Sequence, residues 1–296
     1  MDDFNFKRYL EEKRDIINRG LADLLVAEDE YPQVLHRAMH YSLFAGGKRL
    51  RPVLVLASCE AVGGGAPSAV NTACAMECIH TYSLVHDDLP ALDNDDLRRG
   101  RETCHKVYGE AMAILAGDAL LTAAFEMIGE TTGVEEKRLL KVLLEVARAA
   151  GSSGMIGGQV VDIESEGREI TYPELEYIHI HKTGKLILAS VRSGAILGGG
   201  DEEQLRALTV YGEAVGLAFQ ILDDILDVEG SAEELGKTTG GDEAMGKATY
   251  PSIIGLAASR ERAQDLIGTA LEALSGFGEE AEPLRALALF VVSRKS

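Results

Sequence analysis

The chain has 296 residues, of which 46% are hydrophobic and 26% charged, and its formal net charge at pH 7 is −19. This composition is typical of a globular protein with a large core and excludes a disordered chain. The acidic balance also argues against a nucleic-acid partner, because phosphate backbones are bound by basic surfaces.

The opening residues, MDDFNFKRYLEEKRD, mix acidic and basic side chains and lack the apolar stretch of a signal peptide. No uncharged apolar run reaches the roughly 20 residues that a membrane-spanning helix needs. The four cysteines have no CxxC spacing, and a chain of this length does not need disulfides. We therefore expect a cytoplasmic protein without a membrane span, with reduced and mostly buried thiols.

Apolar residues recur every three or four positions along nearly the whole chain, as between Leu139 and Val146. Since no alternation of period two is sustained, this pattern predicts an all-α fold of about ten helices. The predicted breaks are rich in glycine, proline or charge and fall at residues 61–68, 131–136, 164–174, 197–203 and 236–252. None of them resembles an interdomain linker, so we predict one domain over residues 1–296.

Residues 86–100 read HDDLPALDNDDLRRG, with five aspartates in ten positions and two arginines directly after them. Pro90 cannot continue a helix, because its ring clashes with the preceding turn and it lacks an N–H. The spacing therefore predicts a helix from about Ala69 that ends near Asp87. Asp93 then lies beyond a bend, where it can turn back toward Asp87.

A second acidic cluster, DDILD, occupies residues 223–227. Asp227 is four residues after Asp223 and three after Asp224, so on a helix we expect all three carboxylates on one side. Like charges at this spacing repel one another, which predicts a positive partner. Two inward-facing clusters on different helices would form an oxygen-rich site for Mg²⁺, which takes its other ligands from waters and substrate phosphates.

Two arginines, Arg98 and Arg99, add planar guanidinium groups that pair well with diphosphate oxygens. Either acidic run alone would also be typical of a solvated surface. The occurrence of both runs in one chain favours a site for a metal ion and a diphosphate.

The two clusters together resemble the paired aspartate-rich motifs of the trans-isoprenyl diphosphate synthases. Other segments match this family across most of the chain: GGKRLRP (46–52), HTYSLVHDD (80–88), HKTGKL (181–186), FQILDDILD (219–227) and LGKTTGGDEAMGKATYP (235–251). The proline-containing first motif is similar to that of the bacterial short-chain members. The resemblance implies a homodimeric, single-domain helical bundle around a central active-site cavity, which joins isopentenyl diphosphate to an allylic diphosphate.

The resemblance also implies roles for individual residues. Three magnesium ions are expected with bound diphosphate, and their ligands would be Asp87, Asp93 and Asp223, supported by Asp88 and Asp227. The pocket for isopentenyl diphosphate would be formed by Lys48, Arg51, His80 and Arg99. On the allylic side, Arg98 and Lys237 would hold the diphosphate, and the catalytic residues would be Lys182, Thr183 and Gln220.

Several of these residues have plainer interpretations. Lys48 and Arg51 would also suit a solvated helix start, and His80 a hydrogen-bonded position in the core. Thr183 and Gln220 would also suit ordinary hydrogen bonds between helices. Their functional roles therefore depend on the resemblance.

The length of the product depends on residues before Asp87. Tyr82 and Ser83 lie five and four positions before it, and in the resembling family an aromatic residue at the fifth position accompanies fifteen-carbon products. This implies farnesyl diphosphate made from dimethylallyl or geranyl diphosphate, with geranylgeranyl diphosphate as the alternative. Tyr82 could instead be an ordinary core aromatic residue.

Two other functional classes share parts of this pattern. A class I terpene cyclase has the helical fold and an aspartate cluster but needs no second diphosphate pocket, so Lys48 and Arg51 argue against it. A non-catalytic partner subunit commonly lacks intact aspartate motifs, whereas this chain has both. The polar, glycine-rich residues 236–250 are a candidate lid over the site.

Overall fold

The computed structural model describes residues 4–229 and 248–293. Its longer helices are α1 (Phe6–Leu24), α2 (Gln33–Leu43), α3 (Leu50–Ala61), α4 (Val70–Asp87), α6 (Glu110–Gly129), α7 (Glu136–Ala150), α8 (Met155–Ser165), α10 (Lys185–Gly198), α11 (Glu202–Glu229), α15 (Leu256–Ala273) and α16 (Glu282–Ser293). Short helices are α5 (Cys104–Tyr108), α9 (Tyr172–Ile178), α14 (Tyr250–Ile254), the π-helical η2 (His179–Gly184), and the 3₁₀ turns η1 (Ala66–Ser68) and η3 (Glu279–Ala281). The strands β1 (Leu97–Arg98) and β2 (Arg101–Glu102) form one small antiparallel hairpin. The all-α prediction is confirmed.

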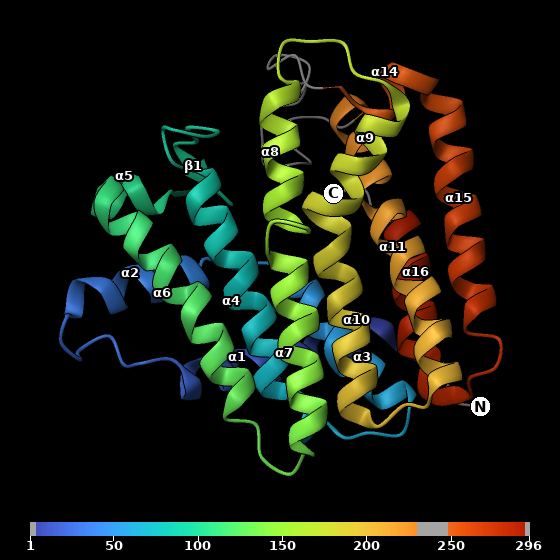
Figure 1. Ribbon diagram of the computed structural model, residues 1–296, viewed down its shortest axis with the longest axis horizontal. Helices are drawn as coiled ribbons and strands as arrows, with labels where there is room; N and C mark the ends of the chain where they lie inside the picture. Colours follow the sequence, from blue (N-terminus) through green and yellow to red (C-terminus); the bar gives the residue numbers. More distant parts are fainter. Residues whose placement is uncertain (1–3, 230–247, 294–296) are drawn as a thin grey trace.

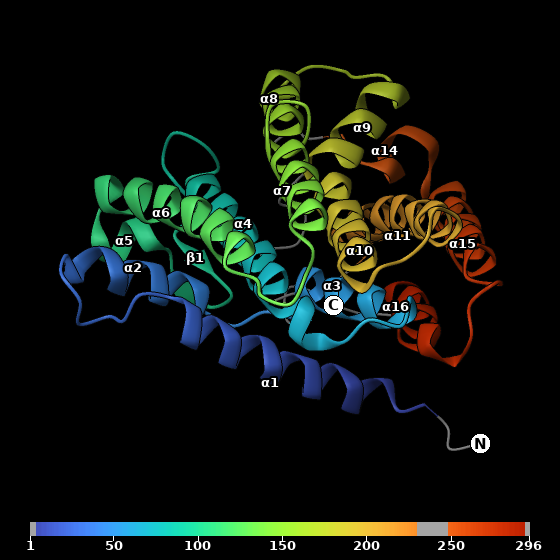
Figure 2. The same ribbon diagram turned by 60° about the horizontal axis from the view of Figure 1, so that its bottom comes forward.

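The long helices form a bundle with α3 in its interior. Figure 1 shows α6, α4, α7, α10, α11 and α15 side by side, and α3 packs against both α4 and α10. Figure 2 shows α1 and α2 along one side of this bundle. The C-terminal ends of α4 and α11 lie at its upper end in Figure 1, near β1, α8, α9 and α14. Both aspartate motifs are therefore carried to the same end of the molecule.

Helix α4, which carries the first motif, is buried on nearly every side, as expected for an apolar helix in the core. It ends at Asp87, as the position of Pro90 predicted. Its cysteines Cys74 and Cys78 are buried free thiols, and so are Cys59 and Cys104. The prediction of reduced, buried cysteines is confirmed.

Four of the five predicted breaks separate helices: α3 from α4, α6 from α7, α8 from α9, and α10 from α11. The fifth, residues 236–252, lies mostly outside the described residues. By length and composition alone, α6 and α11 are apolar enough to cross a membrane. Core helices pass the same test, and here α6 packs against α4 while α11 packs against α10 and α15.

The crossing of α3 and α10 depends on a glycine. A Cβ atom at Gly194 would lie only 2.2 Å from the carbonyl oxygen of Val55 and 2.9 Å from the Cβ of Ser58. These neighbours are buried and belong to the interior helix, so they cannot move aside freely.

We predict that Gly194→Ala lowers the free energy of unfolding by about 2 kcal/mol, because the added methyl group forces the two helices apart. Urea-induced unfolding followed by circular dichroism measures this change. Gly268→Ala on α15 is the matched control, since a Cβ there meets nothing within 4 Å. It should stabilise the helix by up to about 1 kcal/mol. A Gly194 variant as stable as wild type would contradict the prediction.

Candidate active site

The first aspartate motif folds back on the end of α4. After Asp87 the chain turns at Pro90, and the backbone N–H of Asp93 donates to the carbonyl of Asp87 at 2.9 Å. The N–H of Asn94 donates to the carbonyl of Leu89 and closes the same turn. Asp93 therefore returns toward Asp87, as the sequence predicted.

The carboxyl group of Asp87 lies in an environment that resists its charge. Burial raises its pKa to about 6, and the carboxylates of Asp93 and Asp88 add to this effect. Lys182 opposes it, because its ammonium group is close enough to favour the charged form. Lys182 comes from η2, so the end of α4 and the π-helical turn face one site.

In the second motif, Asp223 and Asp227 are half-buried and lie four residues apart on one face of α11. Asp224 points elsewhere: it is buried and accepts hydrogen bonds from the ring of His179 at 2.8 Å and the backbone N–H of Tyr250 at 2.9 Å. The prediction that all three carboxylates share one side was therefore wrong. Adjacent helical residues are about 100° apart, so Asp223 and Asp224 diverge.

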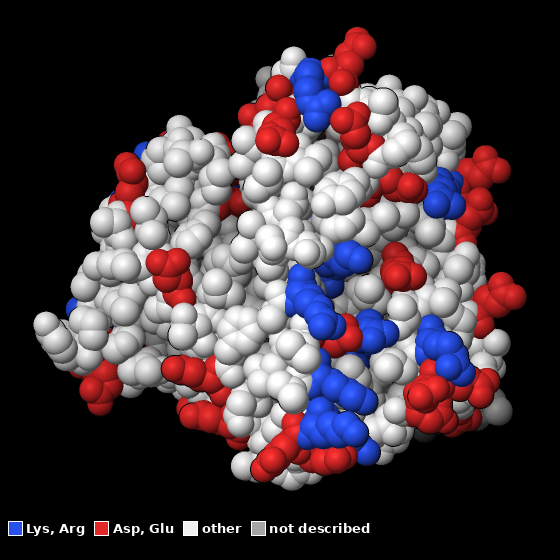
Figure 3. Space-filling model, viewed as in Figure 1, with Lys and Arg blue, Asp and Glu red and all other residues white. Residues whose placement is uncertain are grey.

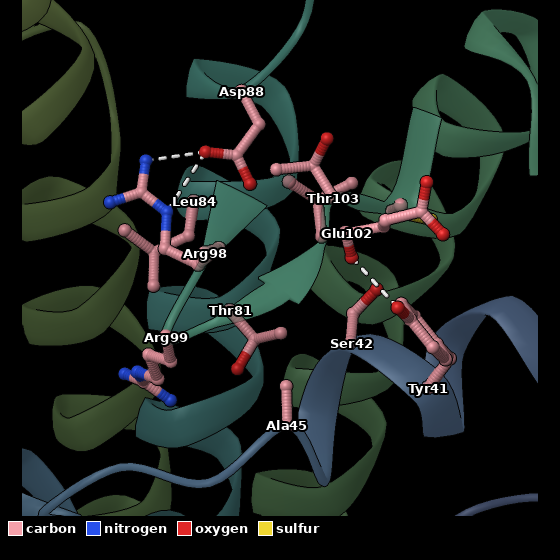
Figure 4. Close-up of a pocket in the computed structure, with 12 residues that line it drawn as sticks. Tyr41, Ser42, Ala45, Thr81, Leu84, Asp88, Arg98, Arg99, Glu102 and Thr103 are labelled. Atoms are coloured by element: carbon pink, nitrogen blue, oxygen red, sulfur yellow. Dashed lines mark hydrogen bonds and ion pairs between the residues drawn. The ribbon is translucent and has the colours of Figure 1, made fainter. Parts of the chain in front are cut away.

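The segment after the first motif forms a hairpin whose turn residues, Arg99 and Gly100, both have positive φ. This geometry is typical of a tight two-residue hairpin turn. Arg98, in β1, donates from Nε to Asp88 at 2.9 Å and from Nη2 to Asp95 at 3.0 Å, as Figure 4 shows for Asp88. The buried carboxylate of Asp88 is thus paired with Arg98, which suits a supporting role.

Figure 4 also shows a small pocket between α2, α4 and the hairpin, lined by Thr81, Asp88, Arg98 and Arg99 among others. Its volume of about 30 Å³ leaves room for little more than a water molecule. It is too small to hold a prenyl chain.

Three of the four residues expected to bind the second diphosphate are brought together. The pKa of His80 is lowered by burial and by the nearby charges of Arg51 and Arg99, among other arginines. Burial also lowers the pKa of Arg51, against the charges of Glu77 and Asp223. The Nε of Arg51 is buried and has no hydrogen-bond partner among the described residues. A buried donor of this kind is suited to an anionic ligand.

The loop before α3 reaches this cluster through glycine. Arg99 donates from Nη1 to the carbonyl of Gly46, and a Cβ at Gly47 would lie 2.4 Å from that same nitrogen. A side chain at residue 47 would make this guanidinium group shift, and the positive φ of Gly47 also favours glycine. This contact joins the GGKRLRP segment, including the exposed Lys48, to the RRG turn.

A buried ion pair that sequence reasoning missed supports this loop. The side chains of Arg49 and Glu77 are only 3% and 2% exposed, and Arg49 donates from Nη1 to Glu77 at 2.7 Å. Arg49 also donates to Asn18 in α1 and to the carbonyl of Leu43 in α2. It thereby ties three helices to the start of α3, between Lys48 and Arg51. The one available signal was a glutamate within the otherwise apolar α4.

On the allylic side, η2 carries Lys182 and Thr183, and Lys182 donates to Asp162 at 2.6 Å. Gln220 is half-buried on α11, one turn before Asp223. Lys237 and the candidate lid up to residue 247 lie outside the described residues.

Tyr82, the predicted floor of the site, is buried in α4. Burial and the charge of Asp87 raise its pKa to about 12, so its hydroxyl lies close enough to feel that carboxylate. The hydroxyl has no hydrogen-bond partner among the described residues, and the ring packs edge-on against His86 at 5.7 Å. Ser83 is half-buried and donates to the carbonyl of His80.

Among the described residues, no three His, Cys, Asp or Glu side chains lie close enough to hold one metal ion. Mg²⁺ does not need such a cage, because it usually binds one or two carboxylates, waters and substrate phosphates. The hard oxygen donors of Asp87, Asp93 and Asp223 at one end of the bundle fit this chemistry.

Comparison with known proteins identifies the family. The model of the polyprenyl synthetase family matches residues 32–281, which is most of the chain. The chain belongs to the polyprenyl synthetase family.

Several relatives of this prenyltransferase cover nearly its whole length. A dimethylallyltranstransferase of Fischerella ambigua is 52% identical over 98% of this chain and 84% of its own. A chloroplastic geranylgeranyl pyrophosphate synthase of Capsicum annuum is 48% identical over 98% of this chain and 79% of its own. The apo crystal structure of an FPP/GFPP synthase from Zymomonas mobilis has a TM-score of 0.88 and 38% identity, covering 98% and 99% of the two chains.

We predict that Glu77→Gln lowers the free energy of unfolding of this polyprenyl synthetase by about 3 kcal/mol, because it leaves the buried charge of Arg49 uncompensated. Urea-induced unfolding measures the change. The control is Glu12→Gln, which removes the exposed Arg8–Glu12 pair and should cost about 0.5 kcal/mol or less. If the two variants lose similar amounts of unfolding free energy, the buried pair stabilises the fold no more than the exposed pair does.

Proposed function

We propose that the protein condenses isopentenyl diphosphate with an allylic diphosphate, either dimethylallyl or geranyl diphosphate, to make farnesyl diphosphate. The observation that carries this proposal is that both aspartate motifs lie at one end of the bundle, each with a cationic side chain near it. The charge of Lys182 acts to lower the pKa of Asp87, and the charge of Asp223 acts to raise the pKa of Arg51. Relatives at about half identity are named for prenyl transfer, which supports the same reaction class.

Mg²⁺ would be held by Asp87, Asp93 and Asp223, with Asp88 and Asp227 in support. Burial raises the pKa of Asp87, and a divalent cation beside it would favour the charged carboxylate. When bound, the ions supply positive charge that stabilises the departing diphosphate. Arg98 and Lys182 would add to this stabilisation from the two sides of the site.

The reaction then proceeds on carbon atoms with no covalent bond to the protein. The allylic C–O bond breaks and its electron pair leaves with the diphosphate, so an allylic carbocation remains. The double bond of isopentenyl diphosphate attacks that carbon, and loss of one proton gives an allylic diphosphate five carbons longer. The departing diphosphate is the base that we assign to this proton.

The second substrate would be fixed by its own diphosphate. Lys48, Arg51 and Arg99 carry the charges for it, and His80, whose pKa is lowered by burial and by the arginines, would bind as the neutral imidazole. Thr183 and Gln220 would orient the allylic substrate with their short polar groups. Apolar helix walls would keep water from the cation.

The product length rests on Tyr82. Its buried ring lies in α4 within the field of Asp87, so a prenyl chain growing along α4 would meet it after few units. Geranylgeranyl diphosphate is the second candidate, because relatives at 48% to 50% identity are named geranylgeranyl pyrophosphate synthases.

A second copy of the chain is the partner that we propose. Large apolar side chains on the neighbouring helices α6, α7 and α8 are between 42% and 58% exposed, namely Ile114, Leu115, Leu140, Leu144, Ile156, Val160 and Ile163. Figure 3 shows few charged side chains over α6. Exposed apolar area of this kind commonly marks an interface. A single-copy mass in light scattering would contradict the homodimer.

The four free thiols favour a cytoplasmic location, which cell fractionation tests.

We predict that the purified chain alone converts isopentenyl diphosphate and geranyl diphosphate into a longer prenyl diphosphate, and that EDTA abolishes this turnover because the leaving group loses its stabilising cations. Chromatography of the dephosphorylated products measures it. A terpene cyclase would consume the allylic substrate and ignore isopentenyl diphosphate. Activity that appears only with an added partner would indicate a non-catalytic subunit.

We predict that wild type stops at farnesyl diphosphate and that Tyr82→Ala shifts the products to twenty carbons or more, because the floor of the cavity is removed. Tyr82→Phe should keep the wild-type distribution, since the hydroxyl has no partner among the described residues. Product chromatography at limiting allylic substrate reads both variants. An unchanged distribution in Tyr82→Ala would exclude Tyr82 as the floor, and a wild type that makes geranylgeranyl diphosphate would favour the second candidate.

A further inference from the structure

The two residues assigned to the allylic side lie on an unusual piece of backbone. His179–Gly184 form the π-helical turn η2 between α9 and α10. Such turns are rare and are frequently found at functional sites. Lys182 and Thr183 are in this turn, so their directions depend on its geometry.

Neighbouring helices approach η2 closely at two glycines. A Cβ at Gly158 of α8 would lie 2.2 Å from the backbone nitrogen of Lys182. A Cβ at Gly216 of α11 would lie 3.2 Å from the Cα of Gly184. The turn is thus packed tightly against backbone on two sides, which leaves little freedom for its position.

The start of η2 is fixed by a buried hydrogen-bond network. One oxygen of Asp224, Oδ2, is 2.8 Å from Nε2 of His179 and 2.9 Å from the backbone nitrogen of Tyr250. Since this oxygen accepts from both groups, Nε2 of His179 carries the proton and donates it. The ring of His179 also stacks on that of Tyr250, with centroids 5.4 Å apart. One carboxylate therefore joins α11, η2 and the first residue of α14.

We propose that Asp224 and His179 are positioning residues for the allylic side of the site. Their hydrogen bond sets the π-helical turn so that Lys182 and Thr183 face the first aspartate motif. Within the DDILD motif, Asp223 and Asp227 then face the metal site. Asp224 instead holds η2 and the start of α14 against α11. This inference rests on the proposed function for the roles of Lys182 and Thr183.

A positioning carboxylate and a metal ligand respond differently to Asp→Asn. The amide oxygen of Asn can accept the same two hydrogen bonds, so Asp224→Asn should retain kcat within about fivefold of wild type. Asp224→Ala removes the acceptor and should lower kcat by about 100-fold, because the catalytic groups are displaced. Its KM for isopentenyl diphosphate and its magnesium requirement should stay at wild-type values. Asp223→Asn is the matched control, and it should raise the magnesium requirement.

Two further measurements separate positioning from simple loss of fold. Hydrogen exchange of the amides of residues 180–186 should speed up in Asp224→Ala and not in Asp224→Asn, while thermal unfolding identifies any global destabilisation. His179→Ala combined with Asp224→Ala should lose less activity than the two single losses predict together, since the two variants remove one shared contact.

The inference is overturned if Asp224→Asn loses as much activity as Asp224→Ala and needs more magnesium, because Asp224 would then be a metal ligand. It is also overturned if Asp224→Ala leaves both kcat and exchange unchanged. An inactive wild type would instead count against the proposed function, and the exchange result would still decide whether Asp224 orders the turn.

Discussion

Two charged groups of the candidate site, Asp87 and Arg51, are held where burial makes their charge costly. Burial holds the pKa of Asp87 at about 6 and lowers the pKa of Arg51, so the fold disfavours the charged forms of both groups. Divalent cations would neutralise the carboxylates, and diphosphates would neutralise the arginines. Binding metal ions and diphosphates together would therefore offset the electrostatic cost of burying these groups.

Such a site works only if its parts are held rigidly. The Arg49–Glu77 pair fixes the start of α3 from within the core, where the residues that would bind the second diphosphate begin. Close backbone approaches do the same elsewhere: Gly47 accommodates Arg99, and Gly158 admits the backbone of Lys182. At each point an added Cβ would lie under 3 Å from its neighbour, so the neighbouring group would have to shift.

The sequence predicts the features that depend only on residues close together in the chain. Helix periodicity gives the all-α fold, and Pro90 gives both the end of α4 and the return of Asp93. Prediction from the sequence fails where the partner of a residue lies far away in the chain. The spacing of DDILD allowed Asp224 to share a face with Asp227, but His179 and the start of α14 draw it to another side. The Arg49–Glu77 pair had only the glutamate in α4 as a signal, and the π-helical turn had none, because both make contacts with residues far away in the chain.

The proposed reaction and the proposed product length depend on different numbers of residues. Condensation, as proposed here, would use both aspartate motifs and the basic loop, and relatives at about half identity are named as a dimethylallyltranstransferase and a geranylgeranyl pyrophosphate synthase. Under the proposed function, product length would depend on a few side chains near Asp87, Tyr82 among them. One aromatic ring at Tyr82 fills the volume of several methylene groups, and a prenyl chain cannot pass through a packed interior. If Tyr82 sets the length, a single substitution would change the product while overall identity barely moves.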